Sequence, residues 1–305
     1  MAHTALKLRY QAILPLLARL PQQLAYPLAT RCARYAERSI HPAERPAIRN
    51  QMARVFNQSP EAQLDGWVSY HFGMVEREYL DTWVFPRLKN LKAIDQFIRL
   101  EGFTPLQQAR ADGRRVMLTG GHFGHFWMAG IGMNARGVSV GTLTRDGDHN
   151  NRHGLPEAEY QFRLKKLAWL QQALGGPFLV SGHHLRPIYR ALDQHVMALL
   201  IDVPYDYPHP GLVGLPFLGK TGWFADGIAR VAKRTNALIF PYYVYEEGRQ
   251  LVARFSPPIE AAAMAEHDIM AQLVAQLESE ILHHPEQWWL WQALPLIWRE
   301  WPGSD

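Results

Sequence analysis

The chain has 305 residues, of which 48% are hydrophobic and 20% charged, and its formal net charge is +4. This length suffices for one large domain or two small ones, and the composition excludes a disordered protein. The single cysteine, Cys32, cannot form an internal disulfide, so nothing indicates an oxidising compartment. The basic excess suits contact with an anionic surface or ligand.

The first 35 residues are basic and amphipathic. Leucines recur among the basic residues, which favours a helical segment lying on an anionic bilayer or, alternatively, a basic helix packed on the domain. Arg19 and several prolines interrupt the apolar run, so a membrane-spanning helix is not expected, and no signal peptide is evident. The basic residues are Lys7, Arg9, Arg19, Arg31 and Arg34, and the leucines are Leu14, Leu17, Leu24 and Leu28.

Hydrophobic periodicity predicts a helical, membrane-facing region over residues 1–100 and an α/β core over residues 101–305, joined as one continuous domain. Alternation of short β-rich runs with helical stretches favours a central, mostly parallel sheet flanked by helices on both faces. The expected strands are 116–119, 138–144, 195–202 and 238–245, with 251–255 as an antiparallel edge strand, and the expected helices are 157–174, 224–235 and 260–283.

Five of the ten tryptophans lie close to the C-terminus. An indole ring is apolar with a polar N–H, so such a cluster suits either a membrane interface or packing against the domain. They are Trp288, Trp289, Trp291, Trp298 and Trp301.

A glycine-rich turn follows the expected strand at 116–119 and places His122 at the strand's carboxyl end, where open α/β sheets bind ligands. Gly121 and Gly124 allow the backbone to approach a substrate closely, and helix-opening N–H groups there can stabilise an oxyanion. A neutral imidazole at this position can accept a proton from an attacking hydroxyl or amine. The alternative is a structural histidine in a hydrogen-bonded turn.

The sequence Thr-Gly-Gly-His-Phe-Gly-His-Phe-Trp at 119–127 resembles the Thr-Gly-His-Phe-Gly-Asn-Trp-Glu signature of the lipid A biosynthesis lauroyl/myristoyl acyltransferase family. That family lies within the lysophospholipid acyltransferase superfamily, which has a His-x4-Asp/Glu motif. The resemblance extends over roughly residues 10–300 and includes Thr144-Arg145, the strand ending at Asp202, Gly-Leu-Pro-Phe-Leu-Gly-Lys at 214–220, the segment 229–241, and His-Pro-Glu-Gln-Trp-Trp-Leu-Trp at 284–291.

The resemblance implies a glycerolipid acyltransferase-like fold and an enzyme that moves a fatty acyl group from acyl carrier protein or coenzyme A. The acceptor would be a hydroxyl or amine of a lipid A-like or specialised molecule, with His122 as the general base and no metal or redox cofactor. Arg145 would bind an anion or the oxyanion. The expected location is the cytoplasmic side of a bacterial inner membrane, as a peripheral protein, or the cytoplasm.

The chain departs from the family where the acidic partner of the histidine is expected, because that position is Trp127 and the usual asparagine is His125. Such a carboxylate is taken to orient the imidazole. A carboxylate elsewhere can replace it, with Asp146, Asp148 and Asp202 as candidates. His125 or a backbone carbonyl can do so instead, or the protein is a catalytically degraded binder of acyl donors or acyl carriers.

The remaining candidates are polar or charged side chains near the motifs. Asp146 and Asp148 belong to a polar stretch after Arg145, and Arg163 and Lys220 are candidates for anion contacts, although solvated side chains are the simpler interpretation. The predicted catalytic residues are His122, Arg145 and Asp202, and the predicted substrate-binding residues are Gly121, Gly124, His125, Trp127, Asp146, Asp148, Arg163 and Lys220.

Two other functional classes have some basis in the sequence. A metal-dependent hydrolase would use histidines and aspartates between 122 and 153, namely His122, His125, Asp146, Asp148, His149 and His153, but their spacing matches no closed ligand set. Nucleic-acid binding is not expected, because no recognisable motif accompanies the basic residues.

Overall fold

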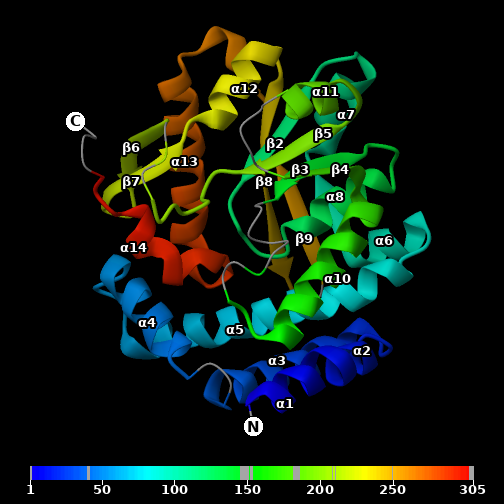
Figure 1. The fold of residues 1–305 in the computed structure, drawn as a ribbon, viewed down its shortest axis with the longest axis vertical. Coiled ribbons are helices and arrows are strands. Elements are labelled where there is room, and N and C mark those ends of the chain that lie inside the picture. Colours follow the sequence, from blue (N-terminus) through cyan, green and yellow to red (C-terminus); the bar gives the residue numbers. More distant parts are fainter. Residues whose placement is uncertain are drawn as a thin grey trace.

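The structure is a computed structural model that describes residues 2–39, 42–144, 151, 154–180, 186–207, 209, 211–248 and 250–301. A central sheet lies between two groups of helices, and the N-terminal helices form a further layer across one end of the molecule (Figure 1). This architecture confirms the predicted α/β class with a mostly parallel sheet flanked by helices.

The N-terminal layer is built from consecutive helices. β1 (Ile98–Glu101) follows them, so a strand begins inside the segment expected to be helical. The helical elements are α1 (Ala2–Leu8), a π-helical turn (Arg9–Ile13), α2 (Leu14–Leu17), α3 (Gln22–Ser39), α4 (Glu44–Val55), α5 (Glu61–Val84), η2 (Phe85–Arg87) and α6 (Leu91–Phe97).

The main sheet has the strand order β1-β9-β8-β2-β5-β3-β4, with a short β10 beside β8. Strands β8, β2, β5, β3 and β4 are mutually parallel, and β9 is antiparallel to β8. The prediction of an edge strand at 251–255 is wrong, because β1 pairs with the outer side of β9. The strands are β2 (Val116–Gly120), β3 (Val140–Thr144), β4 (Gly175–Val180), β5 (Val196–Leu200), β8 (Leu238–Glu247), β9 (Gln250–Phe255) and β10 (Ile259–Glu260).

Helices cover both faces of the sheet. Side chains of β8 alternate between two cores, with Phe240 and Tyr242 packed among α7 and α8 and Ile239 and Tyr243 among α12 and α13. Because both faces of the sheet are buried, the sequences of the parallel strands are almost entirely apolar. The helices are α7 (Phe103–Ala111), α8 (Trp127–Asn134), α10 (Glu157–Leu174), α11 (Arg186–Gln194), α12 (Gly227–Thr235), α13 (Glu266–His283) and α14 (Leu294–Ile297).

Two of the predicted helices begin later than expected. Phe224 belongs to β7 (Lys220–Ala225), which forms a separate hairpin with β6 (Leu212–Phe217), so α12 starts at Gly227. Glu260 ends β10, and a 3₁₀ turn (Ala261–Ala263) precedes α13. The residues before α12 are paired in a strand and those before α13 form the end of a strand and a 3₁₀ turn, a distinction that periodicity in a short run does not reveal.

Within the N-terminal layer, the π-helical turn is held to α5 by a buried ion pair. Arg9 Nε donates to Glu76 Oε1 over 3.1 Å, and both side chains are buried. The expectation that all five basic residues face lipid headgroups is therefore wrong for Arg9, because its guanidinium points inward to a carboxylate. None of the described helices is long and apolar enough to cross a membrane.

We expect Glu76→Gln to destabilise the fold by about 3–5 kcal/mol, because it leaves the guanidinium of Arg9 buried without its carboxylate. The matched control is Glu61→Gln, which removes an exposed partner of Arg49 and should cost less than about 1 kcal/mol. Urea unfolding measures both. Equal losses in the two variants would contradict a buried pair that holds the N-terminal layer.

Candidate active site

His122 lies two residues beyond the end of β2, at the carboxyl edge of the parallel strands. Its side chain is 27% exposed, so solvent reaches part of the ring. Nδ1 lies 2.8 Å from Oδ1 of Asp202, which follows β5, the strand paired with β2. Because an ionised carboxylate only accepts, Nδ1 carries the proton and Nε2 keeps its lone pair.

Asp202 is the carboxylate that lies beside His122 in place of the acidic residue missing at Trp127. Its side chain is fully buried, and Oδ2 accepts the backbone N–H of His122 at 2.8 Å and the indole N–H of Trp288 at 2.9 Å. With the imidazole, three donors therefore surround it, which offsets the cost of burying the charge. Of the three carboxylates considered from the sequence, Asp202 is the one that contacts His122 among the described residues.

The C-terminal segment packs directly on the glycine-rich turn. The backbone oxygen of Gln287 accepts the N–H of Gly124 at 2.8 Å, and the N–H of Trp289 donates to the oxygen of His122 at 2.9 Å. The indole of Trp289 donates to the oxygen of Gly124 at 2.8 Å. The His-Pro-Glu-Gln-Trp-Trp sequence thus fixes the turn. Trp288 and Trp291 are fully buried, which is the packing role considered for the tryptophan cluster.

Gly121 and Gly124 are required by close approaches within the protein. A Cβ on Gly121 would lie 2.8 Å from Oδ2 of Asp202, and one on Gly124 would lie 1.8 Å from the oxygen of Val244. Gly124 also has φ of +54°, a conformation that favours glycine. The structure therefore gives both residues a role in bringing Asp202 and β8 against the turn, and substrate contact by either stays a prediction.

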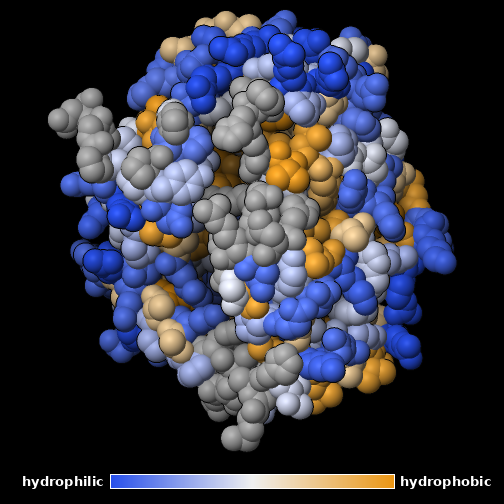
Figure 2. Space-filling model, viewed as in Figure 1, coloured by the Kyte–Doolittle hydropathy of each residue, from blue (hydrophilic) through white to orange (hydrophobic). Residues whose placement is uncertain are grey.

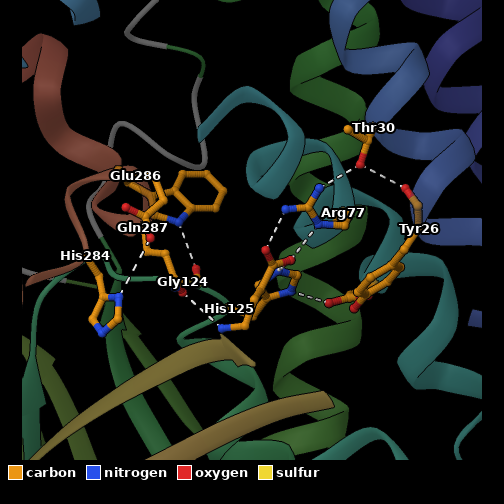
Figure 3. Close-up of polar contacts among 11 residues, drawn as sticks. Tyr26, Thr30, Arg77, Gly124, His125, His284, Glu286 and Gln287 are labelled. Atoms are coloured by element: carbon orange, nitrogen blue, oxygen red, sulfur yellow. Dashed lines mark hydrogen bonds and ion pairs between the residues drawn. The ribbon is translucent and has the colours of Figure 1, made fainter. Parts of the chain in front are cut away.

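His125 does not take the place of the missing acid as a direct partner of the His122 ring, which contacts Asp202 instead. The fully buried ring of His125 lies between Asp81 of α5 and Glu246 of β8, with Nδ1 at 2.5 Å from Asp81 Oδ2 and Nε2 at 2.8 Å from Glu246 Oε1 (Figure 3). The alternative in which His125 replaces the missing acid is wrong, because both ring nitrogens bind other carboxylates.

Trp127 begins α8 and packs on Phe126 and Phe178. It lines a small apolar pocket together with Gly130, Leu174 and other buried residues. The pocket has a volume of about 20 Å³, room for about one water molecule, so an acyl chain would have to displace side chains to enter. Hydrophobic residues also reach the surface near the centre of the face in Figure 2.

The other predicted residues do not meet at His122. Arg163 on α10 pairs with Glu159, and Lys220 lies 5.1 Å from the centre of the Trp298 ring. Neither has a recorded contact with His122 or Asp202, and binding of substrate by either stays a prediction. Arg145, Asp146, Asp148, His149 and His153 lie outside the described residues.

The metal hypothesis gains no support from the described residues. Within them, no three histidine, cysteine or carboxylate side chains group as a metal site would. His122 and His125 each bind carboxylates through their ring nitrogens. Four of the residues that the hypothesis needs, at 146, 148, 149 and 153, fall in segments that the structure leaves undescribed.

The family model described as bacterial lipid A biosynthesis acyltransferase matches residues 1–294. The chain belongs to this family. It is therefore a lipid acyltransferase, as the sequence resemblance implied.

Individual relatives are more distant. A phosphatidylinositol mannoside acyltransferase of Mycobacterium tuberculosis is 24% identical over 264 residues, which cover 85% of this chain and 79% of that protein. One from Mycolicibacterium smegmatis is 22% identical over 288 residues, 93% and 90% of the two chains. The crystal structure of the 1-acyl-sn-glycerophosphate acyltransferase PlsC of Thermotoga maritima aligns with a TM-score of 0.39 and 13% identity, over 88% of this chain and 99% of that one.

Sequence reasoning missed several residues that build this site. Asp81, Glu246, Gln287 and Trp288 contact the glycine-rich turn from positions far along the chain. For Gln287 and Trp288 a signal existed, because both lie in the C-terminal sequence that resembles the family. Asp81 had none, because it is one of several charged residues on α5.

We expect Trp288→Phe to lower the rate of acyl transfer about tenfold, because Asp202 loses one of its three donors and holds His122 less firmly. Trp291→Phe is the matched control, since it also removes a buried indole N–H, which donates to the oxygen of Pro285 at 2.7 Å. Steady-state rates of both variants, compared with their melting temperatures, separate a loss of stability from a loss of orientation. Similar rates in both variants would show that the Trp288 bond has no part in catalysis.

Proposed function

We propose that this enzyme transfers an acyl group from an acyl thioester to a hydroxyl or amine of a lipid acceptor, with His122 as general base and Asp202 as its orienting carboxylate. The observation that carries the proposal is the 2.8 Å contact between Nδ1 of a partly exposed His122 and a fully buried Asp202. A buried carboxylate on Nδ1 fixes the tautomer in which Nε2 is basic and stabilises the imidazolium that forms.

Each step moves one proton or breaks one bond. Nε2 of His122 removes the proton of the acceptor as its oxygen or nitrogen attacks the thioester carbonyl. Backbone N–H groups opening α8, or Arg145, stabilise the oxyanion of the tetrahedral intermediate. The intermediate collapses, the C–S bond breaks, and the imidazolium returns its proton to the leaving thiolate. No metal or redox cofactor enters these steps.

The proposed donor is acyl carrier protein or coenzyme A, as the family resemblance implied. The named mycobacterial relatives act on phosphatidylinositol mannosides, so a glycolipid hydroxyl is the acceptor class that the comparisons favour for this chain. The apolar surroundings of Trp127 suit an acyl chain close to His122, once the pocket opens.

We expect His122→Ala to abolish transfer and Asp202→Asn to reduce its rate by about 10⁴-fold, as in the serine-protease triad where the same carboxylate role is removed. The measurement is mass spectrometry of products formed from acyl-carrier and coenzyme A thioesters with glycolipid, lysophospholipid and amine acceptors. His267→Ala, at an exposed histidine on α13, is the control and should keep full activity. Undiminished transfer by His122→Ala would refute the mechanism.

We further propose that the N-terminal helices lie on an anionic bilayer. Four leucines with exposed fractions of 40–58% occur within the first 24 residues. Exposed basic residues accompany them, and this combination supports adsorption by apolar insertion and attraction to lipid phosphates. The leucines are Leu8, Leu16, Leu20 and Leu24, and the basic residues are Lys7, Arg19, Arg31 and Arg34.

Replacing Leu16, Leu20 and Leu24 together by serine should weaken binding to phosphatidylglycerol vesicles at least about tenfold, because each buried leucine contributes about 1.5–3 kcal/mol. Co-sedimentation measures the bound fraction. Serine at Leu91 and Leu282, which are exposed to a similar extent elsewhere, is the control and should leave binding unchanged. Equal binding by the two variants, or binding indifferent to salt, would exclude this surface as the docking site.

A further inference from the structure

His125 forms the centre of a buried charged cluster that the proposed mechanism does not use. Its two ring nitrogens face the carboxylates of Asp81 and Glu246 over 2.5 and 2.8 Å. Ionised carboxylates only accept hydrogen bonds, so both nitrogens carry protons and the ring is an imidazolium. Figure 3 shows the ring lying between Tyr26 and Arg77 on one side and Gly124 and Gln287 on the other.

The cluster is balanced in charge only while His125 is protonated. Arg77 donates to Glu246 through Nε at 2.6 Å and through Nη2 at 2.5 Å, and the hydroxyl of Tyr26 donates to Asp81 at 2.8 Å. Two cations then offset two carboxylates around a fully buried ring, with Arg77 and Glu246 at the border of a pocket of about 300 Å³. Loss of the proton would place a lone pair against a carboxylate in a medium of low dielectric, so one of the two contacts would have to open.

The cluster is connected to the turn that carries His122 both through the backbone and through hydrogen bonds. His125 is three residues beyond His122, and Gly124 between them donates its N–H to Gln287. The side chain of Gln287 in turn accepts the N–H of Glu246 at 3.0 Å. The turn is thus held at His122 by Asp202 and at its other end by the cluster, so a shift of His125 would be transmitted to the base through the three peptide bonds between them.

We propose that His125, as an imidazolium between Asp81 and Glu246, is a positioning residue that fixes the direction of His122, and that its deprotonation sets an alkaline limit to acyl transfer. The proposal rests on the proposed function of His122. A deviation of about 1 Å in a catalytic group can lower a rate by about 10²-fold, which is the size of effect expected when the cluster opens.

The pKa of Glu246 is lowered, which agrees with a charged cluster, whereas burial raises the pKa of Asp81. Burial alone lowers the pKa of His125, but the carboxylates of Asp81 and Glu246 outweigh it and raise the pKa from 6.5 to about 9. The cluster therefore stabilises the fold fully below pH 6.5, and this contribution is lost as the pH rises through 9. The other ionisable groups that face the cluster are Arg77, Tyr26, Tyr70 and Glu78.

The first test uses protein labelled with ¹⁵N-histidine and needs no substrate. Both ring nitrogens of His125 should be protonated at pH 8 and should titrate near pH 9. Asp81→Asn removes one carboxylate without changing shape, so the titration should move down by about 1–3 pH units and the ring signals of His122 should shift with it. His267→Gln is the control, and it should leave the His122 signals in place.

The second test measures kcat and KM against pH as thiol release from palmitoyl-coenzyme A. Wild-type kcat should fall above pH 9, and Asp81→Asn should move this limb to lower pH. His125→Gln should lower kcat about 10²-fold at pH 8, leave KM nearly unchanged and abolish the limb, because an amide does not titrate. Circular dichroism checks folding, and should His125→Gln not fold, the two Asp81→Asn measurements decide.

The outcomes separate the two proposals. If His122→Ala abolishes transfer but Asp81→Asn changes neither the alkaline limb nor the His122 signals, the positioning role of His125 is refuted and the catalytic role of His122 stands. A neutral His125 ring at pH 8 would refute the positioning proposal in the same way. If His122→Ala keeps its activity, the proposed function itself fails.

Discussion

The carboxylate of Asp202 is the group on which the geometry of the site depends. A fully buried carboxylate is tolerated only when donors surround it, and here they come from the turn after β2 and from the C-terminal tryptophan segment. Three segments distant in sequence therefore converge on two oxygen atoms. Gly121 is a glycine for the same reason, because any side chain would occupy the space of Asp202.

This arrangement accounts for the departure at Trp127. In the signature that the chain resembles, the acidic residue follows the histidine along one segment, and its distance from the ring is set by the conformation of a short turn. Here the carboxylate comes from the neighbouring parallel strand, and strand pairing between β2 and β5 sets its distance. Residue 127 then does not need to be acidic, and the indole of Trp127 packs there on Phe126 and Phe178.

The parts that sequence predicted are those governed by local patterns. Periodicity and turn residues predicted strand β2, the position of His122 at its carboxyl end, and helix α10. Asp202 was one of three candidate carboxylates because it ends a predicted strand, at the edge where parallel strands place ligand-binding residues. The position of β1 outside β9 was not predictable, because a four-residue strand after a helix has no distinctive pattern. The partners of His125 were not predictable either. Asp81 is 44 residues away and Glu246 is 121, and only the packing of α5 against β8 brings them together.

The two histidines of the motif illustrate how the same side chain acquires opposite roles from its surroundings. His122 has one carboxylate on Nδ1, and its side chain is partly exposed. His125 has carboxylates on both nitrogens and no exposure, which raises its pKa to about 9 and keeps its nitrogens from exchanging protons with a substrate. A turn of this kind needs a neutral, partly free ring for chemistry and a rigid frame to aim it. His125 provides this rigidity because it binds α5 of the N-terminal layer and β8 at once. The orientation of the His122 ring is thereby connected to the N-terminal helices, which are proposed to lie on the lipid surface.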